Sequence, residues 1–68
     1  MKWNYYKDIK PVQYTDCLVL YSDEGQIYYT LSYLNSDYEW VNIKGHTELA
    51  NNSDKWVYIQ DIINNIEC

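Results

Sequence analysis

The chain has 68 residues, so we expect a single small domain over residues 1–68. Such a domain buries only about 60% of the surface that its unfolded chain exposes. Ten acidic residues against five basic ones give a formal net charge of −5, and none of the basic residues is an arginine. Proteins that hold nucleic acid neutralise phosphates with Lys and Arg and read guanine with Arg, so this composition argues against direct nucleic-acid binding and favours a basic protein surface as the partner.

The sequence contains no pattern typical of a secretory or membrane-spanning segment. Its first ten residues, MKWNYYKDIK, lack the apolar core of a signal peptide, and no run approaches the ~18 apolar residues of a membrane span. Cys17 lies inside an apolar run and Cys68 is the last residue, so the two cysteines do not suggest a disulfide framework. We therefore expect a cytoplasmic protein that does not bind membranes.

Short β-rich runs dominate the first part of the chain. Residues 2–6 predict a short strand, and residues 8–15 predict a loop because Pro11 lacks the N–H that a central strand needs. Residues 16–22 are apolar on both faces, which predicts a central strand. Residues 23–25, Asp-Glu-Gly, then predict a three-residue hairpin connection with the glycine at positive φ.

The stretch 26–34 alternates between two rows of side chains and predicts the partner strand of this hairpin. Ile27, Tyr29, Leu31 and Tyr33 form the apolar row, which we expect to face the core. Tyr28 belongs to the other, more polar row.

The second half of the chain continues with a turn at 35–37, a strand at 38–43, a polar loop at 44–53 and a last strand at 55–59. The tail 60–67 places its isoleucines on one side of a helix, which is too short to be stable unless it docks on the sheet. The predicted fold class is α+β, mainly β: a small antiparallel sheet, a meander of four or five strands, with a short C-terminal helix. Trp40 and Trp56 are expected to be buried on neighbouring strands.

The order of aromatic, proline and glycine positions resembles the domain of unknown function 551, a family of small domains common in phages and prophages. The matching positions are Trp3, Pro11, Leu18, Val19, Tyr21, Gly25, Trp40 and Trp56. The chain departs from the family pattern in having Lys10 before Pro11, Lys55 before Trp56, and Tyr58 and Gln60 in place of the closing prolines. The resemblance implies a phage or mobile-element protein that works in the host cytoplasm. It implies no activity, because none is assigned to the family.

Residue spacing argues against catalysis and metal binding. His46 is the one histidine, and neither Cys17, expected to be buried, nor Cys68 offers it a nucleophile. Asp23 and Glu24 are adjacent on a predicted turn, whereas acid–base pairs oppose each other across a cleft and calcium loops alternate their ligands. No glycine-rich phosphate loop or Cys/His cluster occurs. We expect no enzyme activity and no cofactor or metal.

The tyrosines and acids of residues 23–40 are the remaining candidates for function, because Tyr and Trp are enriched at binding hot spots. The predicted partner-binding residues are Asp23, Glu24, Tyr28, Asp37, Tyr38 and Glu39. Trp3, Tyr5 and Tyr6 could extend this aromatic patch. The alternative is that these rings make up a core that lacks phenylalanine.

The leading hypothesis is a non-enzymatic acidic inhibitor, similar to anti-CRISPR proteins, that blocks a basic, nucleic-acid-binding surface of a host defence protein. One alternative is a small-ligand binder that stacks nucleotide bases on Tyr and Trp. Another is a structural module that forms a homo-oligomer through its sheet edges.

Overall fold

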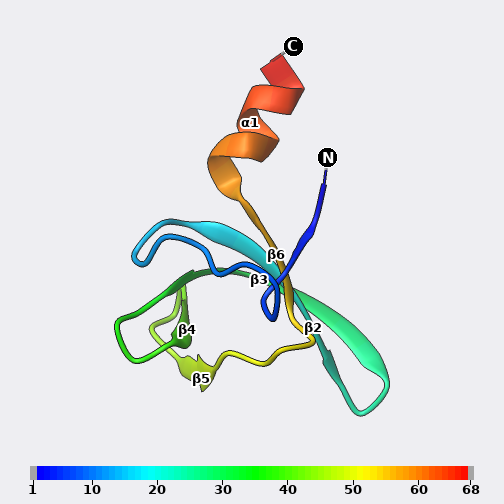
Figure 1. The fold of residues 1–68 in the computed structure, drawn as a ribbon, viewed down its shortest axis with the longest axis vertical. Helices are drawn as coiled ribbons and strands as arrows, with labels where there is room; N and C mark the ends of the chain where they lie inside the picture. Colours follow the sequence, from blue (N-terminus) through cyan, green and yellow to red (C-terminus); the bar gives the residue numbers. More distant parts are fainter. Residues whose placement is uncertain (1, 68) are drawn as a thin grey trace.

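In the computed structural model, residues 2–67 form one antiparallel sheet and a C-terminal helix, with side chains described through residue 66 (Figure 1). The sheet has six strands in the order β1-β6-β2-β3-β4-β5. The elements are β1 (Asn4–Tyr5), β2 (Cys17–Asp23), β3 (Gln26–Leu34), β4 (Glu39–Asn42), β5 (Thr47–Leu49), β6 (Lys55–Tyr58) and α1 (Ile59–Glu67). The predicted class, α+β and mainly β, is confirmed.

The strand order corrects two details of the predicted meander. There are six strands rather than four or five, and β6 inserts between β1 and β2 instead of continuing from β5. Trp40 on β4 and Trp56 on β6 are therefore separated by β2 and β3, and are not on neighbouring strands. The predicted strand at 2–6 shortens to β1, because the chain turns at 6–8, where the Asp8 and Ile9 amides donate to the Tyr5 carbonyl.

The β2–β3 hairpin is tighter than the sequence predicts. Asp23 pairs with Gln26, which leaves a connection of two residues rather than three. Glu24 and Gly25 both have positive φ, 51° and 80°. This conformation at both central residues matches the right-handed twist of the flanking strands, which explains why a non-glycine residue accepts it at position 24.

The segment between β3 and β6 also differs from prediction. The strand expected at 38–43 is β4, Glu39–Asn42, since Tyr38 takes a φ of 60° in the turn that Asn35 organises. Residues expected as a continuous polar loop contain β5, whose Thr47, Glu48 and Leu49 pair with β4. β5 escaped prediction because its three exposed residues form too short a pattern to recognise.

The strand register divides the sheet into two faces, because side chains opposite each other on paired strands point the same way. The core face carries Cys17, Val19, Tyr21, Tyr28, Thr30, Ser32, Leu34, Trp40, Asn42, Trp56 and Tyr58. The open face carries Leu18, Leu20, Ile27, Tyr29, Leu31, Tyr33, Val41, Lys55 and Val57.

The predicted orientation of the second hairpin strand is wrong. Ile27 and Tyr29, expected in the core, are 75% and 77% exposed, while Ser32 and Leu34 of the other row are buried. The alternation in the sequence separates the two rows correctly. Which row is covered depends on segments distant in the sequence, and the Tyr6, Trp40 and Trp56 side chains lie on the Leu34 side.

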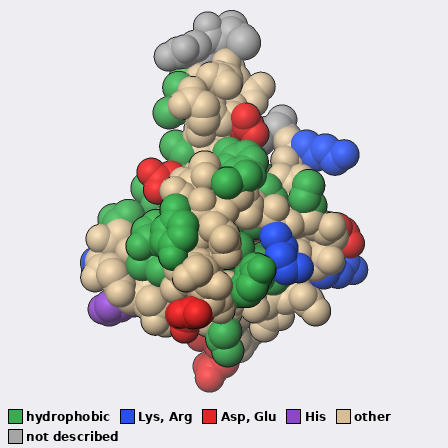
Figure 2. Space-filling model, turned by 60° about the vertical axis from the view of Figure 1, so that its left-hand side comes forward, with side chains coloured by type: hydrophobic (Ala, Val, Ile, Leu, Met, Phe, Trp, Pro, Cys, Tyr) green, Lys and Arg blue, Asp and Glu red, His purple; other side chains and the backbone are tan. Residues whose placement is uncertain are grey.

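Helix α1 follows β6 without a linker and extends away from the sheet (Figure 1). Ile59 and Ile62 are half-buried, but Ile63 and Ile66 are exposed. Figure 2 shows hydrophobic side chains along one side of this projecting helix and on the body of the molecule below it. The expected docking of the helix on the sheet is thus limited to its first turns, and its main contact in the sheet is with β6.

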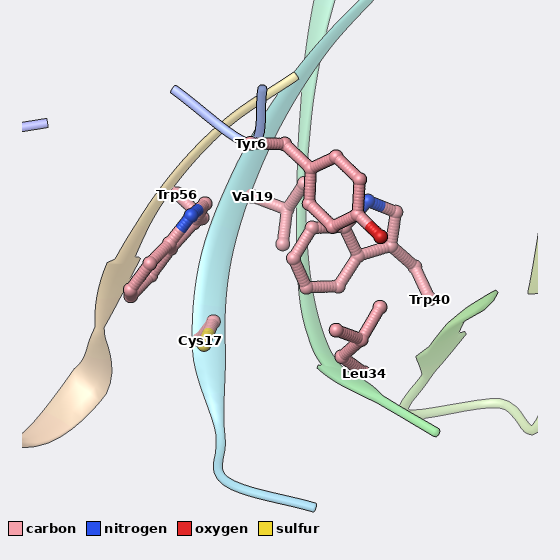
Figure 3. Packing of buried hydrophobic residues seen from close by; sticks show 6 residues of the cluster. All are labelled: Tyr6, Cys17, Val19, Leu34, Trp40 and Trp56. Carbon is pink, nitrogen blue, oxygen red and sulfur yellow. The ribbon is translucent and has the colours of Figure 1, made fainter. Parts of the chain in front are cut away.

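The core is a cluster of Tyr6, Cys17, Val19, Leu34, Trp40 and Trp56 (Figure 3). Tyr6 meets Trp40 edge to face, with the ring centroids 5.8 Å apart, and Trp56 meets Tyr58 in the same manner at 4.8 Å. The Trp56 indole N–H donates to the Ile9 carbonyl at 2.8 Å. Burial of Trp40 and Trp56 is confirmed, and their N–H groups are satisfied as buried indoles require.

Candidate partner-binding site

The structure separates the six predicted partner-binding residues into two groups. Asp23, Glu24 and Tyr28 lie at the β2–β3 turn, whereas the 37–39 group lies at the opposite end of β3. Tyr28 and Leu34 are six residues apart on one strand, a span of roughly 20 Å at about 3.3 Å per residue. The two groups therefore cannot form one compact site.

Tyr28 lies apart from Tyr6 and Tyr38, two other rings of the expected aromatic patch. Tyr28 stacks on Tyr21 with the ring centroids 5.5 Å apart, and Tyr6 is buried against Trp40. Tyr38 is exposed at the far turn, where its carbonyl accepts the Ala50 amide. The tyrosines thus divide between core, hairpin and turn, because the register assigns them to different faces and ends of the sheet.

Residues 37–39 serve the β3–β4 turn. The Asn35 side chain accepts the amides of Asp37 and Glu39 and donates to Glu39 Oε1 at 3.0 Å. Glu39 is therefore half-buried and already engaged. Of this group, Asp37 and Tyr38 remain exposed.

Asp23 instead belongs to a hollow of about 460 Å³ on the core face. The strands β2, β3, β4 and β5 and the two loops that flank β5 contribute to its wall, which is lined by Val19, Tyr21, Ser22, Asp23, Thr30, Ser32, Trp40, Asn42, His46, Glu48, Leu49, Asn51 and Asp54. We call this region the acidic hollow, because Asp23, Glu48 and Asp54 bring three carboxylates to it. Among the residues that the structure describes, no lysine lines it.

Asp54 is the buried carboxylate of the acidic hollow. Its Oδ2 accepts the Trp40 indole N–H at 2.9 Å and the Asn51 amide at 2.8 Å. The Asp54 carbonyl accepts the Tyr6 amide, so one residue connects the loop before β6, the Trp40 ring and the segment after β1. Oδ1 accepts no hydrogen bond from the described residues and keeps its capacity for a further donor.

Ser32 supplies a second unusual polar group in this wall. It is 5% exposed, and its Oγ has no hydrogen-bond partner among the described residues. A buried hydroxyl without a partner costs free energy, typically about 1–3 kcal/mol. It lies beside Thr30 and Asn42 on the core face, with its Oγ sealed from solvent.

The rim residues His46 and Glu48 come from the segment predicted as a loop. Asn42 orders this segment, because its side-chain oxygen accepts the amides of Lys44 and His46. Pairing of β5 with β4 then sets Glu48 opposite Trp40, at the hollow. The sequence signal for Glu48 and Asp54 was weak, because acids in a polar loop are most often simply solvated.

The described residues offer no metal centre: no three His, Cys, Asp or Glu side chains gather closely enough to hold an ion. Within residues 2–67, no helix is long and apolar enough to cross a membrane.

Cys17, one of the two cysteines, is fully buried at the start of β2. Burial, with a smaller contribution from the charge of Asp16, raises the pKa of its thiol from 9.0 to about 12. The thiol donates to the Thr15 carbonyl at 3.4 Å. A protonated, inaccessible thiol is a poor nucleophile.

We expect Cys17 to resist a thiol-specific reagent at pH 8 in a Cys68→Ser variant, and to react fully once the protein is unfolded in urea. The pKa of this thiol is higher in the folded protein than in the unfolded chain, so the unfolded chain loses its proton first as pH rises. The free energy of unfolding should therefore fall as pH rises from 9.0 towards 12. The measurement is labelling rate with and without denaturant. Rapid labelling of the folded protein would contradict the buried position.

Comparisons of the chain with protein-family models, with curated proteins and with solved structures find no match. The resemblance to the domain of unknown function 551 therefore stays a prediction from the residues.

Proposed function

We propose that this protein is a non-enzymatic inhibitor-like binding protein whose acidic hollow accepts a basic side chain of a partner protein. The observation that carries the proposal is the hollow itself, whose wall contains Asp23, Glu48 and the buried Asp54 but, among the described residues, no lysine. An Arg or Lys side chain supplies what this wall lacks: a donor for Asp54 Oδ1, and positive charge beside the three carboxylates of the wall.

The net charge favours the same class of partner. A chain with a charge of −5 is attracted to a basic protein surface, such as one that otherwise binds nucleic acid. In this proposal the hollow anchors one basic side chain while the remaining acids steer the approach. The proposed partner class is a host defence protein with a nucleic-acid-binding surface, as for anti-CRISPR-like inhibitors.

The nucleotide-binding alternative has less support. Tyr21 and Tyr28 stack directly on each other with an interplanar angle of 25°, which leaves no slot between them for a base. The acidic hollow would also repel the phosphates of a nucleotide.

The indole N–H groups provide a direct test. Trp40 donates within the hollow to Asp54, whereas Trp56 donates outside it to the Ile9 carbonyl. We expect a Gly-Arg-Gly peptide, titrated into ¹⁵N-labelled protein at low salt, to shift the Trp40 indole signal and leave the Trp56 signal in place. A Gly-Glu-Gly peptide should shift neither. Physiological salt should weaken the effect, because exposed charges are screened beyond about 8 Å.

A matched pair of charge variants assigns the effect to the hollow. Asp23→Asn with Glu48→Gln removes two acids from its wall, and Asp8→Asn with Asp37→Asn removes two acids elsewhere. The first pair should weaken peptide binding at least about tenfold, while the second should change it little. If both pairs weakened peptide binding equally, binding would depend on net charge alone, and the proposal that the hollow binds the basic side chain would be wrong.

A further inference from the structure

The open face carries an apolar surface that the acidic hollow does not use. Ile27, Tyr29 and Leu31 are exposed, and Leu20 and Tyr33 beside them are half-buried. The register places all five on one side of β2 and β3. Contiguous apolar patches beyond several hundred Å² are rare on monomers, and such patches mark interaction sites.

A groove lies on this face, next to the beginning of α1. Its volume is about 420 Å³, and its apolar wall consists of Leu31, Tyr33, Val41, Ile43 and Ile59. Ile43 at the rim is 80% exposed. The groove is thus a mainly apolar cavity, open to solvent, between the β3–β4 surface and the first residue of the helix, and Asp16, Ser32 and Asn42 are its polar lining residues.

Helix α1 presents a second unpartnered apolar surface. Ile59, Ile62, Ile63 and Ile66 are spaced at i, i+3, i+4 and i+7, so they lie on one side of the helix. We call them the isoleucine stripe. Ile59 already lines the groove, whereas Ile66, two turns later, is 76% exposed. The stripe therefore begins at the groove and leads away from it.

The chain cannot bring these two surfaces together by itself. Tyr58 is the last residue of β6 and Ile59 the first of α1, so no linker allows the helix to fold back over the groove. A second copy has no such restriction, and it carries the same stripe and the same groove. In a two-fold symmetric pair, the helix of each copy can enter the groove of the other copy. The contact between stripe and groove then forms twice in each dimer.

From this arrangement we propose that two copies of the chain associate by reciprocal docking of the isoleucine stripe in the partner's apolar groove. The helix is about 13 Å long at ~1.5 Å per residue, and the groove is lined by residues of β3, of β4 and of the segment after β4. Ser32 and Asn42 line both the groove and the acidic hollow, but the three carboxylates of the hollow, Asp23, Glu48 and Asp54, lie outside the groove.

Charge distinguishes this association from binding of a basic partner. Two copies repel each other because each has a net charge of −5, and the helix adds Asp61 to a groove whose rim contains Asp16. Salt screens this repulsion, so rising salt should strengthen the dimer while it weakens peptide binding in the hollow.

Sedimentation velocity from low micromolar to several hundred micromolar protein tests the proposal. We expect the mass to rise with concentration from 8.2 kDa to twice that value, more readily at high salt. Ile66→Ser and Ile43→Ser change exposed side chains on the two sides of the contact, and each should weaken association about 100-fold, because every dimer contains the altered contact twice. Val12→Ser, at an exposed position outside the groove, is the control and should have no effect.

Disulfide trapping tests the geometry. In a Cys68→Ser background we mix the single variants Ile66→Cys and Ile43→Cys under mild oxidation, with Cys17 buried and inert. A mixed disulfide between the two variants supports helix-to-groove docking. A monomer at every concentration, a dimer insensitive to Ile66→Ser, or a disulfide formed only between two Ile43→Cys chains would each overturn the proposal.

Discussion

Replacing Trp56 with alanine is expected to lower the free energy of unfolding by about 3–5 kcal/mol, the range for deleting a large buried aromatic side chain. Trp56 is 1% exposed on β6, packs edge to face on Tyr58 and donates to the Ile9 carbonyl. The ring thus joins the sheet to the loop between β1 and β2. A domain of this length has a stability of roughly 3–10 kcal/mol, so the variant should be largely or wholly unfolded.

Urea denaturation followed by circular dichroism measures this loss, with Val12→Ala as the control for an exposed apolar side chain. Trp56→Phe isolates the hydrogen bond, because it keeps most of the apolar volume but leaves the Ile9 carbonyl without its indole donor. We expect an intermediate loss for this variant. A Trp56→Ala protein with the unfolding midpoint of the parent would place the ring on the surface and contradict the described core.

Asp54→Ala is the second substitution with a large expected effect. It removes the acceptor of the Trp40 indole N–H and of the Asn51 amide. Each donor left unsatisfied costs about 1–3 kcal/mol, more when the lost acceptor is charged. We therefore expect a loss of roughly 2–5 kcal/mol in the free energy of unfolding and a changed Trp40 indole signal.

Asp54→Asn and Asp37→Ala distinguish the loss of the Asp54 hydrogen bonds from the mere loss of a negative charge. Asparagine keeps one carbonyl oxygen for these donors, so its loss of stability should be smaller than that of alanine. Asp37 is an exposed acid at the far turn, and its replacement should change stability by less than about 0.5 kcal/mol. If Asp54→Ala and Asp37→Ala were equally mild, Asp54 would not organise the wall of the hollow.

Only part of the candidate site could be predicted from the sequence. Asp23 was recognised because a Gly-containing turn and two flanking strands define its position locally, and the structure does bring it to the acidic hollow. Glu48 and Asp54 were not among the predicted site residues. Their presence in the same wall as Asp23 depends on the pairing of β5 with β4 and on the hydrogen bond from Trp40 to the loop before β6, which are contacts between segments distant in the chain.

Local patterns were sufficient for the elements themselves. Alternation in residues 26–34 predicted β3 with its correct bounds. Turn-forming residues placed both hairpin connections, although the first connection is one residue shorter than predicted. The isoleucines of residues 60–67 predicted a helix with one apolar side, and the structure adds Ile59, which was expected to end the last strand. Each of these signals acts over a few residues. At that range, the backbone preferences of the residues and the periodic placement of their side chains determine which element forms.

Tertiary packing decided which surfaces are buried. β2 is apolar on both faces, so local patterning could not choose between covering the Leu34 row and covering the Ile27 row of β3. The Tyr6, Trp40 and Trp56 rings all lie on the Leu34 side, and burial of three large aromatic side chains outweighs the exposure of Ile27 and Tyr29. Helix α1 follows β6 directly and extends away from the sheet. Val57 is buried on the open face, but Ile27, Tyr29 and Leu31 on that face and Ile63 and Ile66 of the stripe stay exposed within the described chain. They do so because most long-range burial, which no local period encodes, was satisfied on the opposite side.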